Sequence, residues 1–283
     1  MANITIATTD VLLPEVWSPL ILETLHDTTV MLPLVDRRYE AFAKGQRGDT
    51  VRVPAIAEIS STTLTNMTGS ITFSANTEAA TTNINIDTFR YTAVKIDKGS
   101  MVLNPMPIVE LYSAEIGRAL GEGIDTSIMT AMDGTTNAVG LDNVAVHDGL
   151  ILEAKETLDK NNNRSEDRHS VWSAESYNDL IQVDKYANSL YATSTGQLAA
   201  GKGDAYKGRI YDFSVQMSNN IPAGAAGNKN FMWQRTGIAA VFLDDVQMDS
   251  KEPHDEFAVA VRAWAIYGVK LMRANSVIEI DAR

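Results

Sequence analysis

The stretch from Pro107 to Asp133 constrains this chain more than any other, because it has the residue spacing of one long helix. Apolar or aromatic residues recur at every fourth position, at Ile108, Tyr112, Ile116, Leu120, Ile124, Ile128 and Met132. At about 1.5 Å per residue, such a helix is on the order of 40 Å long, which is more than one small core needs. We therefore predict a spine helix that joins separate parts of the fold and ends at the turn Asp133-Gly134.

Three glycines lie inside this predicted helix, Gly117, Gly121 and Gly123. Each costs roughly 1 kcal/mol relative to alanine in a helix interior. A close approach of neighbouring atoms and a bend in the helix both explain them, and the sequence leaves both open. The start of the helix is expected at Asn104 and the Pro105/Pro107 pair, because proline is accepted in a first turn.

Composition excludes several classes of function. The chain has 283 residues, of which 45% are hydrophobic and 21% charged, as in a folded protein of one large or two ordinary domains. It has no cysteine and four scattered histidines, which removes thiolate chemistry and leaves little for a metal centre. A net charge of −12 without basic runs argues against a dedicated nucleic-acid reader. No Lys or Arg precedes Arg37 and no apolar run reaches the roughly 18 residues of a membrane span, so we expect a cytosolic protein.

An arm and a projecting hairpin are expected in the first hundred residues. Ser18-Pro19 predicts the start of a short helix that has too little surface for its own core. Residues 45–49 read as a turn, and a strand with Pro54 at an exposed edge follows. Fifteen of the 24 residues from 60 to 83 are Ser, Thr or Asn, which predicts a projecting tip.

The return strand of this hairpin is expected at residues 83–97, as one long strand. Its apolar face changes parity, from Ile84 and Ile86 to Phe89 and Tyr91, so it should cross more than one environment.

The second half of the chain mixes helices and strands irregularly. We expect a helix capped by Asp148 with Ile151, Ala154 and Leu158 inward, and a helix capped by Ser173 with Tyr177, Leu180, Ile181 and Tyr186 inward. We expect strands at 168–172, 211–217, 257–272 and 277–280, a loop at 188–208, an apolar run at 238–243 and an acidic loop at 244–256. This order predicts an α+β architecture.

No motif in the sequence organises a chemical site. GQLAAGKG at 196–203 resembles a phosphate-binding loop, but Gly203 stands where a Ser or Thr belongs. Asp159, Asn161 and Asn163 match the first ligands of a calcium loop, yet Arg164 replaces its glycine, so we interpret them as a helix stop. The His147-Asp148 and His254-Asp255 pairs lack a nucleophile or third ligand, and the four tryptophans (Trp17, Trp172, Trp233 and Trp264) are interpreted as packing residues.

The chain resembles the major capsid proteins of tailed bacteriophages with the HK97-type fold. The resemblance lies in the order of arm, hairpin, spine helix, compact α/β unit and returning strands, and in three segments. These are MANITIATTDVLLPEVWSPLILETL with TTVMLPLVDRRYE and GDTVRVP, then KGRIYDFSVQMSNNIP, and finally FAVAVRAWAIYGVKLMRANSVIEID.

The resemblance implies an HK97-like α+β fold divided into five regions. These are an N-terminal arm and link (1–44), an extended loop (45–97), a peripheral domain with the spine helix (98–145), an axial domain (146–228) and returning strands of the peripheral domain (229–283). It implies a virion subunit, not an enzyme and without cofactor, that forms hexamers and pentamers in the host cytoplasm and encloses DNA. A separate scaffolding protein, a portal and a decoration protein are implied partners, whereas the lack of Lys between Arg47 and Val94 argues against covalent cross-linking from the loop.

Because the arm and the hairpin cannot bury themselves, their apolar residues are the predicted contacts between copies. These contacts are Trp17, Leu20, Ile21, Val51, Val53, Ile56, Ile71, Phe73, Ile84 and Ile86. Two alternatives stay open: an encapsulin-like compartment on the same fold, which would hold protein cargo, and a nucleotide-binding enzyme built on the 196–203 loop.

Overall fold

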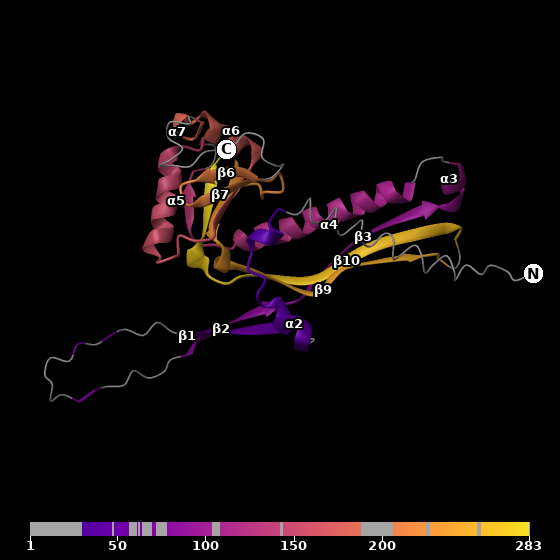
Figure 1. Cartoon of the computed structure of the whole chain (residues 1–283), viewed down its shortest axis with the longest axis horizontal. Coiled ribbons are helices and arrows are strands. Elements are labelled where there is room, and N and C mark those ends of the chain that lie inside the picture. Colours follow the sequence, from indigo (N-terminus) through magenta and orange to yellow (C-terminus); the bar gives the residue numbers. More distant parts are fainter. Residues whose placement is uncertain are drawn as a thin grey trace, which may run out of the picture.

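The protein is an extended beam with a compact unit and a hairpin at one end (Figure 1). The structure is a computed structural model that describes residues 30–46, 48–56, 78–103, 108–141, 144–187, 206–224, 227–253 and 256–282, with positions 61, 63, 70 and 71. The described strands form sheets of two, three and six strands, and helices cover them. The predicted α+β class is confirmed, and no described helix is long and apolar enough to cross a membrane.

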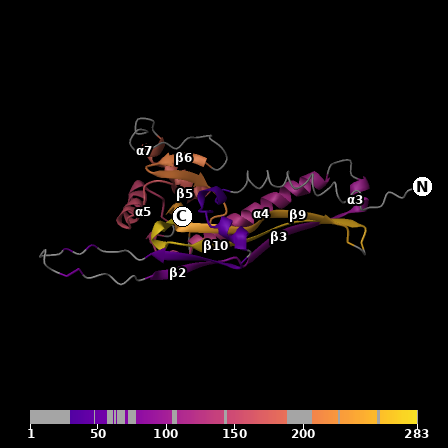
Figure 2. The same ribbon diagram turned by 60° about the horizontal axis from the view of Figure 1, so that its bottom comes forward.

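The beam consists of helix α4 (Ile108–Met132) packed along a three-stranded antiparallel sheet. The sheet has the order β3 (Thr88–Asp97), β10 (Ala258–Leu271), β9 (Ile238–Lys251), and both views show α4 running along it (Figures 1 and 2). The short helix α3 (Lys98–Leu103) lies at the far end of the beam. The spine prediction is confirmed, with Ile116, Leu120, Ile124, Ile128 and Met132 buried, but Tyr112 is 44% exposed and does not belong to the buried stripe.

Close packing explains one of the spine glycines. A β-carbon on Gly123 would lie 2.6 Å from Cδ of Arg90, whose guanidinium reaches across to donate a hydrogen bond to Ser127 Oγ at 3.2 Å. Glycine at this position leaves room for the observed placement of the Arg90 side chain. Gly117 and Gly121 are also buried.

The compact unit is built on a mixed six-stranded sheet. Its order is β4 (Ala138–Gly140), β11 (Val277–Ala282), β8 (Asn228–Gln234), β5 (Arg168–Trp172), β7 (Phe213–Met217), β6 (Tyr206–Ile210). Helices α5 (Asp148–Lys160), α6 (Ala174–Gln182) and α7 (Asp184–Ala187) belong to this unit. The resemblance implied that residues 229–283 are returning strands of the peripheral domain. Within them, β8 and β11 lie inside this six-stranded sheet, because β8 pairs with β5 and β11, and β11 pairs with β4 and β8.

The helix predictions in this unit hold with small corrections. Ser173 caps α6 by accepting a hydrogen bond from the Ser176 amide at 3.1 Å, and Tyr177, Leu180 and Tyr186 are buried. Ile181 is 43% exposed, contrary to the prediction. The N-cap of α5 is His147, and Asp148 lies in the first turn.

The hairpin pairs β1 (Thr50–Ile56) with β2 (Glu78–Asn85), and the register shifts at Pro54. The predicted single return strand at 83–97 is wrong. Strand β2 ends at Asn85, and Ile86 and Asp87 belong to no strand. The next strand, β3, then joins the three-stranded sheet beside β10. The change of apolar parity marks this change of sheet.

The chain reaches the hairpin by passing around the β9 edge of the three-stranded sheet. Residues 30–35, which include the 3-10 turn η2 (Leu32–Leu34), pack with α4, and Asp36 forms a parallel bridge to Ala239. Helix α2 (Glu40–Gln46) then lies against β9 on the hairpin side. The predicted turn at 45–49 is therefore corrected, since Gly45 belongs to this helix.

Two further predictions are corrected by long-range pairing. The expected acidic loop at 244–256 is strand up to Lys251, because β9 stays paired with β10 and Asp249 lies opposite Arg262. The expected strand at 211–217 begins at Phe213, since Tyr211 lies in the turn after β6 with a positive φ of 49°. The expected end of the loop at residue 208 is wrong, because β6 starts at Tyr206. Two 3-10 turns, η4 (Arg235–Gly237) and η5 (Ala274–Ser276), complete the described elements.

Candidate assembly surface

The base of the hairpin is held on the three-stranded sheet by a small apolar cluster. Ala43, Ile84, Ile86, Ala239 and Val241 are buried together there. The hairpin crosses β10 at Gly268, where a β-carbon would overlap the carbonyl oxygen of Asn85 and lie 2.8 Å from its carbonyl carbon. The same sheet therefore packs α4 on one face and the hairpin base on the other.

The predicted contact residues fall into three groups. Ile84 is fully buried and Ile86 is 8% exposed, so these two are corrected from contacts between copies to core residues of the subunit. Val51 and Val53 are half-buried beside the same cluster, and Ile71 is 71% exposed. Trp17, Leu20, Ile21 and Phe73 lie outside the described residues, and Ile56 ends β1 with its side chain not described.

An aromatic strip lies uncovered on the sheet face opposite α4. It consists of Phe89, Tyr91 and Trp264, which adjoin in the register of β3 and β10. Phe89 is 57% and Tyr91 66% exposed. Arg262 lies over the Trp264 ring at 5.4 Å and pairs with Asp249 at 2.5 Å. Aromatic residues flanked by arginine are typical of the buried centre of protein interfaces.

The far end of the beam also exposes apolar side chains. Phe257 is 87% and Val102 is 85% exposed. The strand ends beside them are tied by ion pairs, from Lys98 to Glu252 at 2.6 Å and from Lys95 to Glu256. The exposed apolar side chains thus lie beside segments that ion pairs join.

A buried carboxylate attaches the incoming chain to the spine. Asp125 is fully buried, and its side chain accepts hydrogen bonds from the backbone amides of Val30 at 3.0 Å and Met31 at 3.3 Å. Burial raises the pKa of Asp125 to about 6, and these amides offset part of the rise. Sequence reasoning missed this residue, although its position four residues before Met129 places it on the buried stripe.

An ion triad joins the end of the spine to the six-stranded sheet. Lys229 of β8 contacts Asp133, just beyond α4, at 2.5 Å and Glu279 of β11 at 2.8 Å. The hydrogen bonds to Asp133 and Glu279 raise the pKa of Lys229, and burial raises the pKa of Glu279. The lysine is thus held charged at the point where the beam meets the compact unit.

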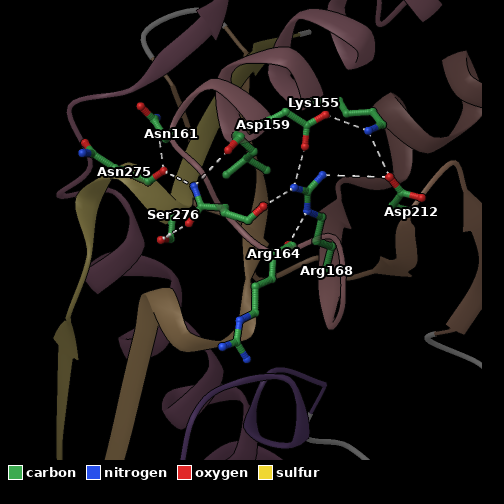
Figure 3. Close-up of polar contacts among 10 residues, drawn as sticks. Lys155, Asp159, Asn161, Arg164, Arg168, Asp212, Asn275 and Ser276 are labelled. Atoms are coloured by element: carbon green, nitrogen blue, oxygen red, sulfur yellow. Dashed lines mark hydrogen bonds and ion pairs between the residues drawn. The ribbon is translucent and has the colours of Figure 1, made fainter. Parts of the chain in front are cut away.

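The calcium-like residues form a structural cluster instead of a metal site (Figure 3). Asp159 accepts from Arg168 at 2.6 Å and pairs with Lys155 at 2.8 Å, so its carboxylate is already engaged. Asn163 donates to the Asn275 carbonyl at 2.8 Å, and Asn162 has a left-handed φ of 53°. The helix-stop interpretation is confirmed, since α5 ends here.

The other chemical motifs form no described catalytic site. Asp148 accepts hydrogen bonds from Lys185, Tyr186 and Tyr211, which hold its pKa below the usual value although burial alone would raise it. Trp172 and Trp233 are buried, as expected of packing residues. Residues 196–203 and the His254-Asp255 pair lie outside the described residues. Within the described chain, no group of His, Asp or Glu is arranged to hold a metal ion.

Comparison with solved structures finds the same fold in chains from bacteriophages and from a virus-like particle. A chain of Mycobacterium phage Che8 matches with a TM-score of 0.70 and 22% identity over 89% of this chain and 90% of that one. The capsid of cyanophage P-SCSP1u matches with a TM-score of 0.66 and 18% identity, over 83% and 84% of the two chains. A virus-like particle from Pyrococcus furiosus matches with a TM-score of 0.63 and 10% identity, over 95% and 100%.

No family model matches the sequence, and no curated protein matches it significantly. The likeness is therefore one of fold, and it extends over 83–95% of this chain in these three matches. The predicted HK97-type fold is confirmed.

Proposed function

We propose that this protein is the major capsid subunit of a tailed bacteriophage, many copies of which close into an icosahedral shell around phage DNA. The observation that supports this most is the match to a phage capsid chain over 83% of this chain and 84% of that one. Fold alone hosts many functions, so surface features must agree with it. The uncovered aromatic strip and the apolar tip supply such features, because a solitary soluble protein seldom leaves grouped apolar residues exposed.

In this proposal the hairpin, the beam and the six-stranded unit take the places of the extended loop, peripheral domain and axial domain. The copies would meet as hexamers and pentamers in the host cytoplasm, with a separate scaffolding protein, a portal and a decoration protein as partners. The net charge of −12 suits a container that encloses DNA without gripping it. The proposal assigns the protein no enzymatic role. The encapsulin-like alternative is less favoured, because the sequence identity is 22% and 18% to the two phage chains named above but 10% to the virus-like particle from Pyrococcus furiosus.

The test removes the hairpin tip without disturbing its base. Residues 57–77 are replaced by Asn-Gly, which links the paired residues Ile56 and Glu78 by a two-residue turn. The exchange spares Ile84 and Ile86, which are core residues. We expect a folded subunit with nearly unchanged unfolding temperature but no closed particles by electron microscopy and light scattering.

A second variant carries a Gly/Ser segment of the original length in place of 57–77, which separates the length of the tip from its sequence. The intact protein should give closed particles, and the cargo of those particles, DNA or protein, distinguishes a capsid from a compartment. Closed shells from the Asn-Gly variant would contradict the role of the hairpin in assembly.

A further inference from the structure

A groove lined by arginines lies between the hairpin base and the six-stranded sheet. It has a volume of about 590 Å³, and its walls include Arg38, Arg164 and Arg273 with the apolar residues Val53, Pro54 and Met272. No Asp or Glu lines it among the described residues. In a chain of net charge −12, three guanidinium groups around one cavity make a local site for carboxylates.

Two of these arginines are free to bind a partner. Arg38 already pairs with Asp36 at 2.5 Å. No ion pair joins the exposed Arg164 or Arg273 to a carboxylate in the described part of the chain. Figure 3 shows the guanidinium of Arg164 directed away from the Asp159–Arg168 cluster, although the Arg164 carbonyl accepts from Arg168 at 2.8 Å.

The sequence of the N-terminal segment matches this groove in charge and in apolar character. Residues 1–29 contain Asp10, Glu15, Glu23 and Asp27 but no Lys or Arg. Within them, SPLILETLHD at 18–27 mixes leucines with acids, so it can offer carboxylates to the arginines and apolar side chains to Val53, Pro54 and Met272. A nucleic-acid backbone would satisfy the charges only. Glu166 and Asp167 line the adjoining cavity and would repel either anion, so the apolar residues of the groove are what favours the segment.

The start of the described chain and the groove lie on opposite faces of the three-stranded sheet, which favours a segment from another copy of the chain. Val30, where the described chain begins, is bound to Asp125 on the α4 face. The arginine groove opens beside the hairpin base on the opposite face, and the chain passes between the faces only at the Asp36 bridge. A copy's own arm would have to fold back around that edge, whereas the arm of a neighbour can approach directly.

We propose that the arginine groove receives the acidic N-terminal segment, residues 1–29, of a second copy of this chain. This inference rests on the proposed function in one respect, since assembly is what brings copies together. It assigns a receptor to the predicted contacts Leu20 and Ile21, and it places Val53 in the receiving surface.

Disulfide trapping between two distinguishable full-length chains tests the inference, and the natural chain contains no cysteine to interfere. One chain carries Thr82→Cys in the groove, and the other carries Thr24→Cys in the arm together with a mass tag. Mild oxidation of the mixture should yield the tagged heterodimer. Adding Arg164→Gln and Arg273→Gln to the groove chain should lower the yield roughly two- to thirty-fold, the range for losing two exposed ion pairs. Arg209→Gln, an exposed arginine of β6 outside the groove, should leave the yield unchanged.

Three results would overturn the inference. The first is equal trapping with and without the groove arginines. The second is the absence of the heterodimer when a further chain, which carries both Thr82→Cys and Thr24→Cys, forms the disulfide within itself. The third is that a labelled DNA oligonucleotide binds only when Arg164 and Arg273 are present, whereas disulfide trapping does not require them. Electron microscopy of the same mixtures separates the two proposals, because closed particles without trapping refute only the groove assignment, and trapping without particles refutes only the shell function.

Discussion

Gly268→Ala should loosen the hairpin from the beam. Gly268 lies in the middle of β10, opposite Val241 of β9, where the backbone of Asn85 and Ile86 crosses the sheet. The added β-carbon would overlap the Asn85 carbonyl oxygen and lie 3.1 Å from the α-carbon of Ile86. These are backbone atoms that cannot rotate away, so the crossing segment must retreat by on the order of 1 Å or more.

The magnitude follows from two opposed effects. Alanine is favoured over glycine in a strand by roughly 0.5–1 kcal/mol, whereas overpacking a core costs about 1–3 kcal/mol. The retreat also opens the cluster around Ile84 and Ala239, which are fully buried. We expect a net loss of about 1–2 kcal/mol in the free energy of unfolding, or a fall of a few degrees in the melting temperature at roughly 2–4 °C per kcal/mol.

The assay is thermal unfolding of the unassembled chain, together with electron microscopy of assembled material. Gly45→Ala is the matched control, because a β-carbon there meets no atom within 4 Å and alanine favours helix α2. This control should be neutral or slightly stabilising and should assemble normally. A Gly268→Ala protein as stable as the parent, with normal particles, would refute the argument that the hairpin base is fixed by this close crossing.

Three further predictions concern the spine and its surroundings. The folded-state pKa of Asp125, about 6, lies above its ordinary 3.8, so the contribution of Asp125 to stability is full below pH 3.8 and is lost as the pH rises through 6. Asp125→Asn should remove this loss of stability. If the urea midpoint of the variant keeps the same dependence on pH as the parent, the prediction is wrong. Leu120→Asp, at a fully buried position, should cost several kcal/mol and give insoluble protein, so soluble, assembling material would show the core to be misassigned. Assembled particles should withstand EDTA, since the described chain groups no metal ligands, and dissociation by chelator alone, followed by light scattering, would contradict this.

Local patterns predicted the spine helix, α5, α6 and β5 because in each the apolar spacing coincides with the buried face. The prediction failed where pairing partners decide the outcome. The acidic stretch after Leu243 remains strand because β10 lies beside it and Arg262 pairs with Asp249, and neither partner is visible from the composition of the stretch itself. Conversely, the uniform β-type pattern from Asn83 to Asp97 contains a change of sheet at Ile86-Asp87.

The candidate surface was predictable only in part for a related reason. Apolar residues such as the half-buried Val51 and Val53 can be picked out in a hairpin. Whether a given isoleucine faces a neighbour or its own subunit depends on what crosses beneath it. Ile84 and Ile86 lie over β9 and β10, so they became core. The arginine groove was not predicted, because its three arginines are contributed by segments more than a hundred residues apart in the chain.

The joint between the beam and the six-stranded unit bears on how such a subunit could build a curved shell. The spine reaches both parts, packing on β10 along its length and ending at Asp133, which pairs with Lys229. Beyond that pair, Thr135 donates to the Val277 carbonyl at 2.9 Å and Asn137 donates to the Ala274 carbonyl at 2.9 Å. Several directional bonds at one place fix an angle, whereas apolar packing alone tolerates sliding. These bonds favour one angle between the two units, and in the proposed shell curvature would then be adjusted chiefly at contacts between copies.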